Sequence, residues 1–239
     1  MRRATGGTYS NSAMKTTACI KLLALLLLAA CEVSGTLAVY ELTGKSSGGN
    51  SGSGGSGTPA PAEPEKPAFP DVPADSPYAD AIRWAVEQGI TNGVTADLFQ
   101  PNGTCTRGQA VTFLWRAAGS PEPKGSTMPF TDVASGSYCE KAVLWAVENG
   151  ITNGTTATTF SPNAGCTRAQ IVALIFRSQQ GTPAAGDLPF TDVPAWAYDA
   201  IAWSYQQGIV KGTTETTFSP NALCTRGQIV TFLYRALSK

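Results

Sequence analysis

The sequence predicts a mainly helical fold made of three helix–loop–helix repeats over residues 69–239. The first observation that predicts it is a Phe-x-Asp-Val motif, which recurs at spacings of 61 and 60 residues and begins at Phe69, Phe130 and Phe190. The second is a Cys-Thr-Arg-x-Gln segment, which occupies 105–109, 166–170 and 224–228. Repetition at a fixed period indicates one supersecondary unit per copy.

The first helix of each repeat is predicted from its boundaries and its apolar spacing. In repeat 1, Ser76-Pro77 supplies an N-cap and a first-turn proline, and Gly89 stops the helix. The apolar residues between them fall at helical spacing: Tyr78, Ala81, Ile82, Ala85 and Val86.

The second helix of each repeat is predicted to begin at a capping box. In this arrangement a Thr hydroxyl and a Gln side chain three residues later each satisfy the other's backbone N–H. The pairs are Thr106/Gln109, Thr167/Gln170 and Thr225/Gln228. A cysteine precedes each threonine and faces an apolar residue five positions later, as in a hydrophobic staple. These pairs are Cys105/Ala110, Cys166/Ile171 and Cys224/Ile229.

The three repeated cysteines are interpreted as small buried apolar residues, because three equivalent thiols cannot pair completely with one another. A disulfide that includes the unmatched Cys139 is the alternative. No metal site or other cofactor is expected, since no two of these cysteines lie close in sequence and the chain has no histidine.

Composition excludes several classes of function. Without histidine, Ser-His-Asp triads, Cys-His nucleophiles and His-ligated zinc sites are ruled out. Residues 69–239 carry 11 basic and 13 acidic side chains, a net charge of −2, which argues against nucleic acid as a partner. The Asp of Phe-x-Asp-Val occurs in all three repeats, which suits binding or structure better than one active site. No enzymatic activity is therefore expected.

The repeats are expected to fold as one body, because a unit of about 60 residues makes only a marginal core. Their expected boundaries are 69–128, 129–188 and 189–239.

Residues 1–38 are predicted to be a signal-peptide region. Lys15 and Lys21 precede an apolar run at 22–30, which is shorter than the roughly 20 residues that a membrane-spanning helix needs. Met14 gives a more ordinary signal-peptide length than Met1.

The run ends in Leu28-Ala29-Ala30-Cys31, which resembles the bacterial lipobox and implies lipidation of Cys31 and attachment to a membrane. Ordinary cleavage after Thr36-Leu37-Ala38 is the alternative. Residues 39–68 are rich in Gly, Ser and Pro, a composition that predicts a flexible linker.

Together the repeated motifs resemble the S-layer homology domain. Its copies open with Phe-x-Asp-Val, carry a Gly-x-x-x-Gly loop and Phe-x-Pro-Asn, and continue with Ile-Thr-Arg-Ala-Glu. The glycine spacing recurs here at 89–93, 150–154 and 208–212, and Phe-x-Pro-Asn begins at Phe99, Phe160 and Phe218. This chain departs from the pattern by Cys for Ile and by Gln for Glu. The resemblance implies a pseudo-threefold helical spindle with a central helical bundle.

The resemblance also implies non-covalent binding of a cell-wall polysaccharide, often a pyruvylated one, at the cell surface. Carried over by position, it marks Arg107, Arg168 and Arg226. A cation in the first turn of a helix is disfavoured by a few tenths to about 1 kcal/mol. Helix stability therefore does not explain why arginine occurs at these positions. A guanidinium beside exposed helix-start N–H groups does suit a carboxylate or phosphate. An ion pair with the Asp of Phe-x-Asp-Val is the alternative.

Two further repeated positions are candidates for glycan contact. Trp84, Trp145 and Trp203 present rings that stack on sugars, although a repeated aromatic residue more often belongs to the core. Asp71, Asp132 and Asp192 accept either sugar hydroxyls or local backbone N–H groups, and the local-capping interpretation is favoured.

The leading functional hypothesis is therefore an extracellular module that anchors to the cell wall through an anionic secondary polysaccharide. The rival is a surface scaffold that binds a partner protein and no glycan.

Overall fold

The computed structural model describes residues 69–184 and 186–238, which contain six α-helices and one short 3-10 helix joined by turns and loops. The α-helices are α2 (Ala79–Glu87), α3 (Arg107–Ala117), α4 (Glu140–Glu148), α5 (Arg168–Ser178), α6 (Tyr198–Gln206) and α7 (Arg226–Leu237), and η2 (Ala195–Ala197) directly precedes α6. The expected mainly helical class is confirmed. The signal region 1–38 with Cys31, and the linker 39–68, lie outside the described residues.

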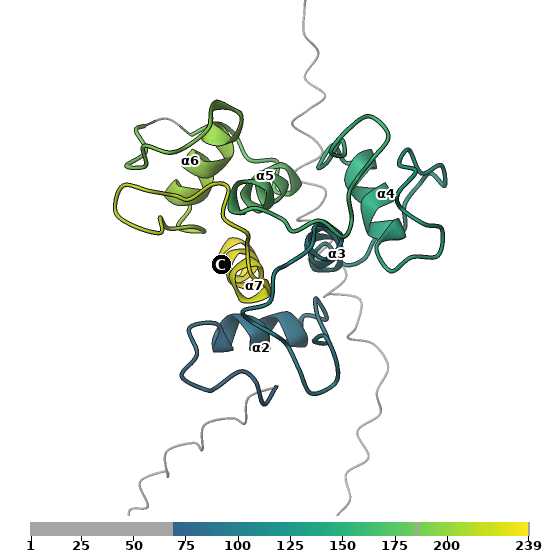
Figure 1. Ribbon diagram of the computed structural model, residues 1–239, viewed down its shortest axis with the longest axis horizontal. Coiled ribbons are helices and arrows are strands. Elements are labelled where there is room, and N and C mark those ends of the chain that lie inside the picture. The colour runs from purple at the N-terminus through teal and green to yellow at the C-terminus, as the bar shows by residue number, and fades with distance from the viewer. Residues whose placement is uncertain (1–68, 185, 239) are drawn as a thin grey trace, which may run out of the picture. The chain divides into compact units, whose positions relative to one another are not determined.

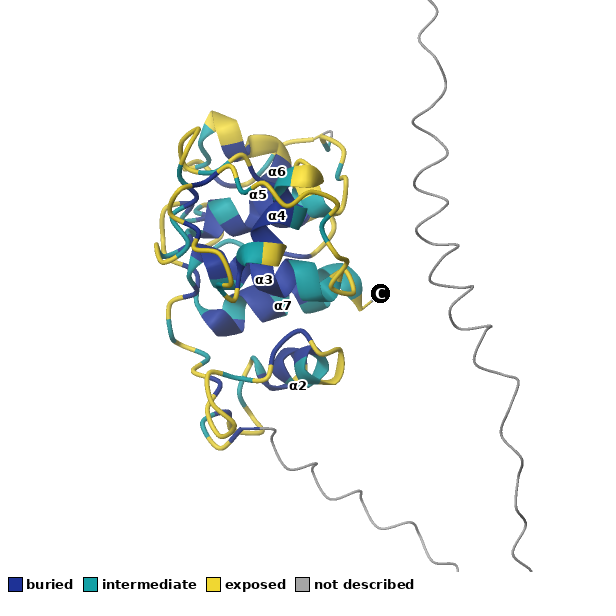
Figure 2. Cartoon of the chain, turned by 90° about the vertical axis from the view of Figure 1, so that its right-hand side faces the viewer, coloured by how far each residue is buried: buried dark blue, intermediate teal, exposed yellow. Residues whose placement is uncertain are grey.

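The first helix of each repeat packs on the second helix of the repeat before it. Helix α4 contacts α3 and α6 contacts α5, while α2 of repeat 1 contacts α7 of repeat 3. Helix α3 also contacts both α5 and α7. Figure 1 shows α3, α5 and α7 grouped together, with α2, α4 and α6 around them. The buried residues concentrate on the helices of this group, as the dark blue segments of Figure 2 show.

The N-terminal end of the first helix differs from the sequence prediction. Helix α2 begins at Ala79, its N-cap is Tyr78, and no side chain caps it. Ser76 instead closes a turn before the helix, where its carbonyl accepts the N–H of Ala79 at 3.0 Å. The prediction of the helix end is confirmed, since Gly89 has a φ of +66°, the left-handed conformation that ends helices.

The capping boxes of the second helices are confirmed in all three repeats. Each Thr side chain accepts the N–H of the Gln three residues later, and that Gln side chain accepts the Thr N–H. These boxes fix where α3, α5 and α7 begin.

A ring of backbone hydrogen bonds joins the starts of these three helices. The N–H of Cys105 donates to the carbonyl of Cys224 at 2.9 Å, that of Cys224 to Cys166 at 2.8 Å, and that of Cys166 to Cys105 at 2.9 Å. The ring closes repeat 3 onto repeat 1. The three repeats therefore share one hydrogen-bonded centre.

The thiols in this ring have the buried apolar role that the sequence predicts. Cys105, Cys166 and Cys224 are fully buried, and all four described cysteines are free thiols, including Cys139. Burial raises the pKa of Cys166 and of Cys224 to about 12. At neutral pH these thiols are protonated and unreactive.

No helix among residues 69–184 and 186–238 combines the length and the apolar character that crossing a membrane requires.

Candidate functional site

The arginine of the Cys-Thr-Arg segment occupies the first position of each of α3, α5 and α7. The exposed fraction is 6% for Arg107, 6% for Arg168 and 4% for Arg226. The structure thus places these three candidates at equivalent sites, but beneath the surface rather than on it.

Each arginine binds the Phe of the Phe-x-Pro-Asn motif in the next repeat. The Nε of Arg107 donates to the carbonyl of Phe160 at 2.9 Å, and its guanidinium carbon lies 4.8 Å from the centre of the Phe160 ring. Arg168 makes the same two contacts with Phe218, at 3.0 and 4.6 Å. Arg226 closes the cycle by binding Phe99 of repeat 1, at 2.8 and 4.8 Å. The arginines therefore hold the three repeat junctions together.

The helix-start N–H groups are not available to a ligand, so that part of the sequence interpretation is wrong. The N–H of Arg107 donates to the carbonyl of Ala164 at 2.9 Å, and that of Gly108 to Pro162 at 2.8 Å. The starts of α5 and α7 are occupied in the same way by carbonyls of the following repeat. The bond to the Phe carbonyl uses Nε of each arginine, so Nη1 and Nη2 are the atoms that could bind a further acceptor.

These outer nitrogens differ between junctions. Nη2 of Arg168 donates to the carbonyl of Lys211 at 3.0 Å. Nη2 of Arg226 is buried and has no acceptor among the described residues. A buried donor of this kind normally has a water or ligand partner. At the junction between repeats 3 and 1, Nη2 of Arg226 can therefore donate a hydrogen bond to one more acceptor.

Electrostatics at the junctions follow from burial. Burial lowers the pKa of Arg107, and the nearby Cys166 and Asp132 oppose that shift. Arg168 and Arg226 behave in the same way, with Asp192 and Asp71 as the nearby acids. Among the described residues, ion pairs join Arg83 to Asp80 and Lys141 to Glu122. These pairs do not involve the junction arginines. The acids act on them through space rather than as direct partners.

The aspartates of Phe-x-Asp-Val fix the loop that carries the junction Phe. Asp132 accepts the N–H of Phe160 at 2.8 Å and that of Ser161 at 2.7 Å. Asp71 and Asp192 bind the loops of repeats 1 and 3 in the same way. The expectation of a local cap is therefore wrong about the partner, which lies more than 25 residues further along the chain.

This clamp has an electrostatic consequence. Burial opposes the ionisation of Asp132, but the hydrogen bonds from Phe160 and Ser161 and the charge of Arg107 outweigh it, so the pKa of Asp132 lies below its usual value. The pKa of Asp192 is lowered for the same reasons, with Arg168 as the cation.

The three tryptophans are half-buried and pack against the core. The rings of Trp84 and Tyr234 lie 5.5 Å apart, as do those of Trp203 and Phe176. Both pairs join the first helix of one repeat to the second helix of the repeat before it. These contacts support the core interpretation, while Trp84 also lines a pocket.

An exposed position beside the Arg168 junction was not predicted from the sequence. Lys211, whose carbonyl binds Arg168, lies directly before a glycine of the Gly-x-x-x-Gly loop. Asn92 and Asn153 hold the equivalent exposed positions in repeats 1 and 2. The signal was available, because these residues lie inside the glycine motif, but only the structure places the position next to an arginine.

Comparison with known proteins agrees with the repeat pattern. The family model of the S-layer homology domain matches residues 68–111, 129–172 and 189–230. An endoglucanase from Bacillus sp. (strain KSM-635) is 37% identical over 50% of this chain and 13% of its own length. A cell surface protein from Thermoanaerobacter kivui is 30% identical over 71% of this chain and 21% of its own.

A cellulosome-anchoring protein from Acetivibrio thermocellus is 26% identical over 62% of this chain and 35% of its own length. The chain thus spans a minor part of each of these three relatives. The family model matches three successive segments that together exceed half of the chain, and this chain belongs to the S-layer homology domain family.

Proposed function

We propose that the three repeats anchor this chain to the bacterial cell wall by binding an anionic wall polysaccharide non-covalently, with no catalytic role. The observation that carries the proposal is the threefold recurrence of one buried arginine at a repeat junction. Each repeat also has an exposed polar residue before the second glycine of its glycine loop, and in repeat 3 this residue contacts Arg168. A polymer with a repeating acidic group would meet three similar sites on one unit.

The family relationship supports an extracellular location at the cell surface. The relatives include proteins named as a cell surface protein and a cellulosome-anchoring protein, and each is much longer than the matched segment. A shared segment in surface proteins and in polysaccharide-degrading enzymes suits a module that attaches different polypeptides to the same wall.

In this proposal the guanidinium groups supply positive charge and the exposed neighbours supply direct contact. The Nε bond and the Phe ring hold each guanidinium in a fixed orientation, so little conformational entropy is lost when an acidic group binds. Lys211 adds a second charge at the junction of repeats 2 and 3, and Asn92 and Asn153 offer amides at the other two.

The proposal has four further parts. They are a pseudo-threefold spindle arrangement of the repeats, a pyruvylated ligand, direct glycan contact by the aspartates and tryptophans named above, and a lipid on Cys31.

The test replaces the exposed positions and leaves the arginines intact, because the arginines also hold the fold. The variant Asn92→Asp, Asn153→Asp, Lys211→Asp adds three negative charges and removes one positive charge at exposed sites, so the net charge falls by four. We expect it to lose sedimentation with purified wall sacculi, since like charges would repel the polymer.

A control variant places the same charge change in the exposed segment between repeats 1 and 2: Lys124→Asp, Ser126→Asp, Thr127→Asp. It should sediment as the wild-type chain does. Equal sedimentation of both variants, with unchanged helical circular dichroism, would reject the junctions as the binding sites.

A further inference from the structure

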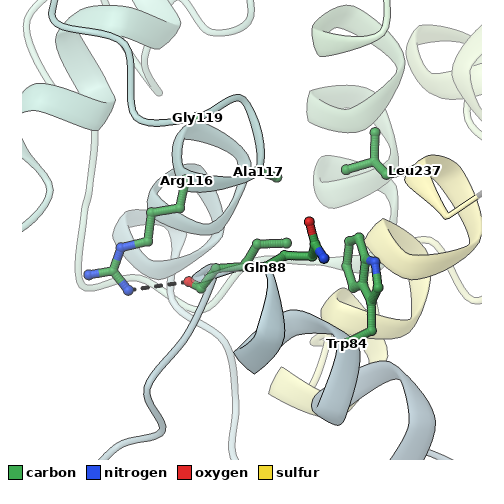
Figure 3. Close-up of a pocket in the computed structure, with 7 residues that line it drawn as sticks. Trp84, Gln88, Arg116, Ala117, Gly119 and Leu237 are labelled. Carbon is green, nitrogen blue, oxygen red and sulfur yellow. Dashed lines mark hydrogen bonds between the residues drawn. The ribbon is translucent and has the colours of Figure 1, made fainter. Parts of the chain in front are cut away.

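A pocket of about 400 Å³ lies at the carboxyl ends of α3 and α7, against α2. Trp84 and Gln88 line it from the first helix of repeat 1, Ala117 and Gly119 from the end of α3, and Leu237 from the end of α7. Figure 3 shows the Gln88 amide beside the Trp84 ring, with Leu237 on the α7 side.

The pocket is separate from the junction arginines. Arg226 begins α7 and Leu237 ends it, so the two lie about 16 Å apart along the helix axis, given the rise of 1.5 Å per residue. A ligand in this pocket would therefore not touch the arginine junctions.

The side chains around the pocket favour a neutral ligand with both an apolar face and hydroxyl groups. Trp84 offers an aromatic face, Ala117 and Leu237 offer apolar contact, and Gln88 offers an amide that both donates and accepts. Two helices end at the pocket, and the negative end of a helix dipole disfavours an anion.

Arg116, a cation that lines the pocket, does not compensate for this. Nη1 of Arg116 donates to the carbonyl of Ile90 at 3.2 Å. Figure 3 shows the Arg116 guanidinium directed away from Trp84 by this bond. The Arg116 guanidinium is thus not directed at a carboxylate bound in the pocket.

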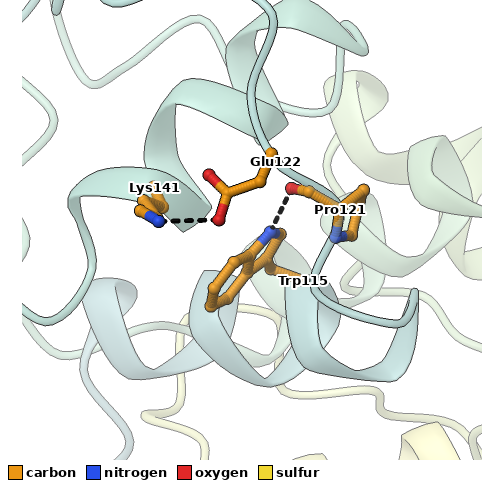
Figure 4. Close-up of polar contacts among 4 residues, drawn as sticks. All are labelled: Trp115, Pro121, Glu122 and Lys141. Carbon is orange, nitrogen blue, oxygen red and sulfur yellow. Dashed lines mark hydrogen bonds and ion pairs between the residues drawn. The ribbon is translucent and has the colours of Figure 1, made fainter.

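In repeats 2 and 3 the chain before the first helix contacts the helix that carries the equivalent tryptophan. In repeat 2, the N–H groups of Lys124 and Gly125 donate to the Glu148 carboxylate of α4, at 3.0 and 2.6 Å. Figure 4 shows the same segment held by the bonds from Trp115 to Pro121, at 2.8 Å, and from Lys141 to Glu122, at 2.7 Å.

In repeat 3, a Cβ on Gly181 would lie 3.1 Å from the Trp203 ring, so the backbone passes directly against that tryptophan. Backbone therefore lies against the Trp203 ring, whereas the Trp84 ring lines a pocket. Trp203 can therefore serve as the control for sugar binding at Trp84.

We propose that this pocket binds a neutral pyranose ring of a wall glycan, stacked on the face of Trp84 with its hydroxyls toward Gln88. The inference rests on the proposed wall-binding function and adds a second site of different chemistry. Acidic groups bind at the junctions, and a neutral sugar binds at the opposite end of the central helices.

The test is a titration of the full chain, labelled with ¹⁵N-tryptophan, which contains five tryptophans. The probes are glucose, galactose, mannose, their N-acetyl-2-amino counterparts, and glucuronate. The Trp84 indole signal is assigned by its loss in Trp84→Phe. We expect it to shift saturably with at least one neutral sugar, while the Trp203 signal stays unchanged. Glucuronate should bind roughly fivefold more weakly than glucose because of the helix ends.

Two variants keep the test decisive. Ala117→Phe fills the pocket and should abolish the shift of a Trp84 signal that is still present. Gln88→Ala changes an exposed residue and should weaken the shift without affecting folding. A Trp84 signal that moves with none of the neutral sugars, or that moves equally in Ala117→Phe, would overturn the proposal.

The variant Asn92→Asp, Asn153→Asp, Lys211→Asp should keep the sugar-induced shift. Its sedimentation with sacculi tests the junctions alone, so failure of the pocket and failure of wall binding at the junctions give different results.

Discussion

At the scale of single residues, the junction arginine has a structural reason that its sequence position hides. From the sequence, a cation at a helix start is unfavourable, and an anionic ligand explains its presence there. The structure adds a carbonyl and an aromatic ring from the next repeat, 50 or more residues away for Arg107 and Arg168 and 127 away for Arg226. No local pattern encodes contacts of that range, which is why the burial of these arginines could not be predicted.

Replacing one junction arginine should destabilise the whole unit. Arg226→Ala removes a buried charged hydrogen bond and a cation–π contact, and we expect it to lower the free energy of unfolding by about 3 kcal/mol. Arg226→Lys should recover part of this loss, because it keeps the charge but not the Nε geometry. Chemical denaturation followed by circular dichroism measures both, and a loss below about 0.5 kcal/mol for the alanine variant would show that the junction contact is dispensable.

The glycine after each of two arginines also has a packing reason. A Cβ on Gly227 would lie 2.8 Å from carbons of the Tyr78 ring and 3.0 Å from the carbonyl of Pro101. Gly227→Ala should therefore cost about 1–3 kcal/mol, because a ring and a backbone segment must move. Repeat 2 already has alanine at the equivalent position, so Ala169→Gly is the matched control and should cost no more than about 1 kcal/mol. Thermal denaturation compares them, and equal midpoints would contradict the clash.

At the scale of elements, the second helices were predictable and the start of the first helix was not. A capping box is a local device of four residues, so Thr106 and Gln109 reveal it in the sequence. Helix α2 begins without a side-chain cap, and its position depends on packing against α7, which belongs to the other end of the repeat array. Ser76 and Pro77 were misleading because they form the preceding turn.

The aspartate clamp makes the junction loops sensitive to acid. Ser161 has a φ of +59°, which is unfavourable for a residue with a side chain, and Asp132 holds the N–H groups of Phe160 and Ser161 in this loop. Because the folded-state pKa values of Asp132 and Asp192 lie below the usual value, their stabilisation is complete above the unfolded-state pKa. It is lost as the pH falls through the folded-state pKa.

The variant Asp132→Asn, Asp192→Asn should remove that part of the pH dependence. Between pH 7 and pH 3, the denaturation midpoint of the wild-type chain should fall further than that of the variant. The variant should also be the less stable of the two at pH 7. A wild-type and variant pair with parallel pH profiles would show that the clamp carboxylates do not contribute.

At the scale of the whole molecule, the repeats form a closed cycle rather than a row. Helix α2 of repeat 1 packs on α7 of repeat 3, the Cys105–Cys224–Cys166 backbone bonds close the same way, and Arg226 binds Phe99. Internal repetition predicts that the copies pack together. It does not predict which helix packs on which neighbour, because every copy carries the same surfaces.

Closure predicts that the third repeat is required for the first two to fold. A chain that ends at residue 188 would lose α7, and with it the partner of α2 and of the Phe99 loop. We expect this truncated chain to show reduced helical circular dichroism and no cooperative unfolding transition. A sharp two-state transition with two thirds of the native helical signal would show instead that the repeats fold independently.

In the proposed function, an acidic wall polymer, and not a wall protein, holds this chain at the cell surface. The most direct measurement is the sedimentation of the wild-type chain with protease-treated sacculi, before and after acid extraction of the wall polysaccharide. We expect sedimentation to survive the protease treatment, to disappear after extraction, and to be inhibited when the extracted polymer is added back in solution. Sedimentation that disappears with protease treatment, or that persists unchanged after extraction, would contradict it.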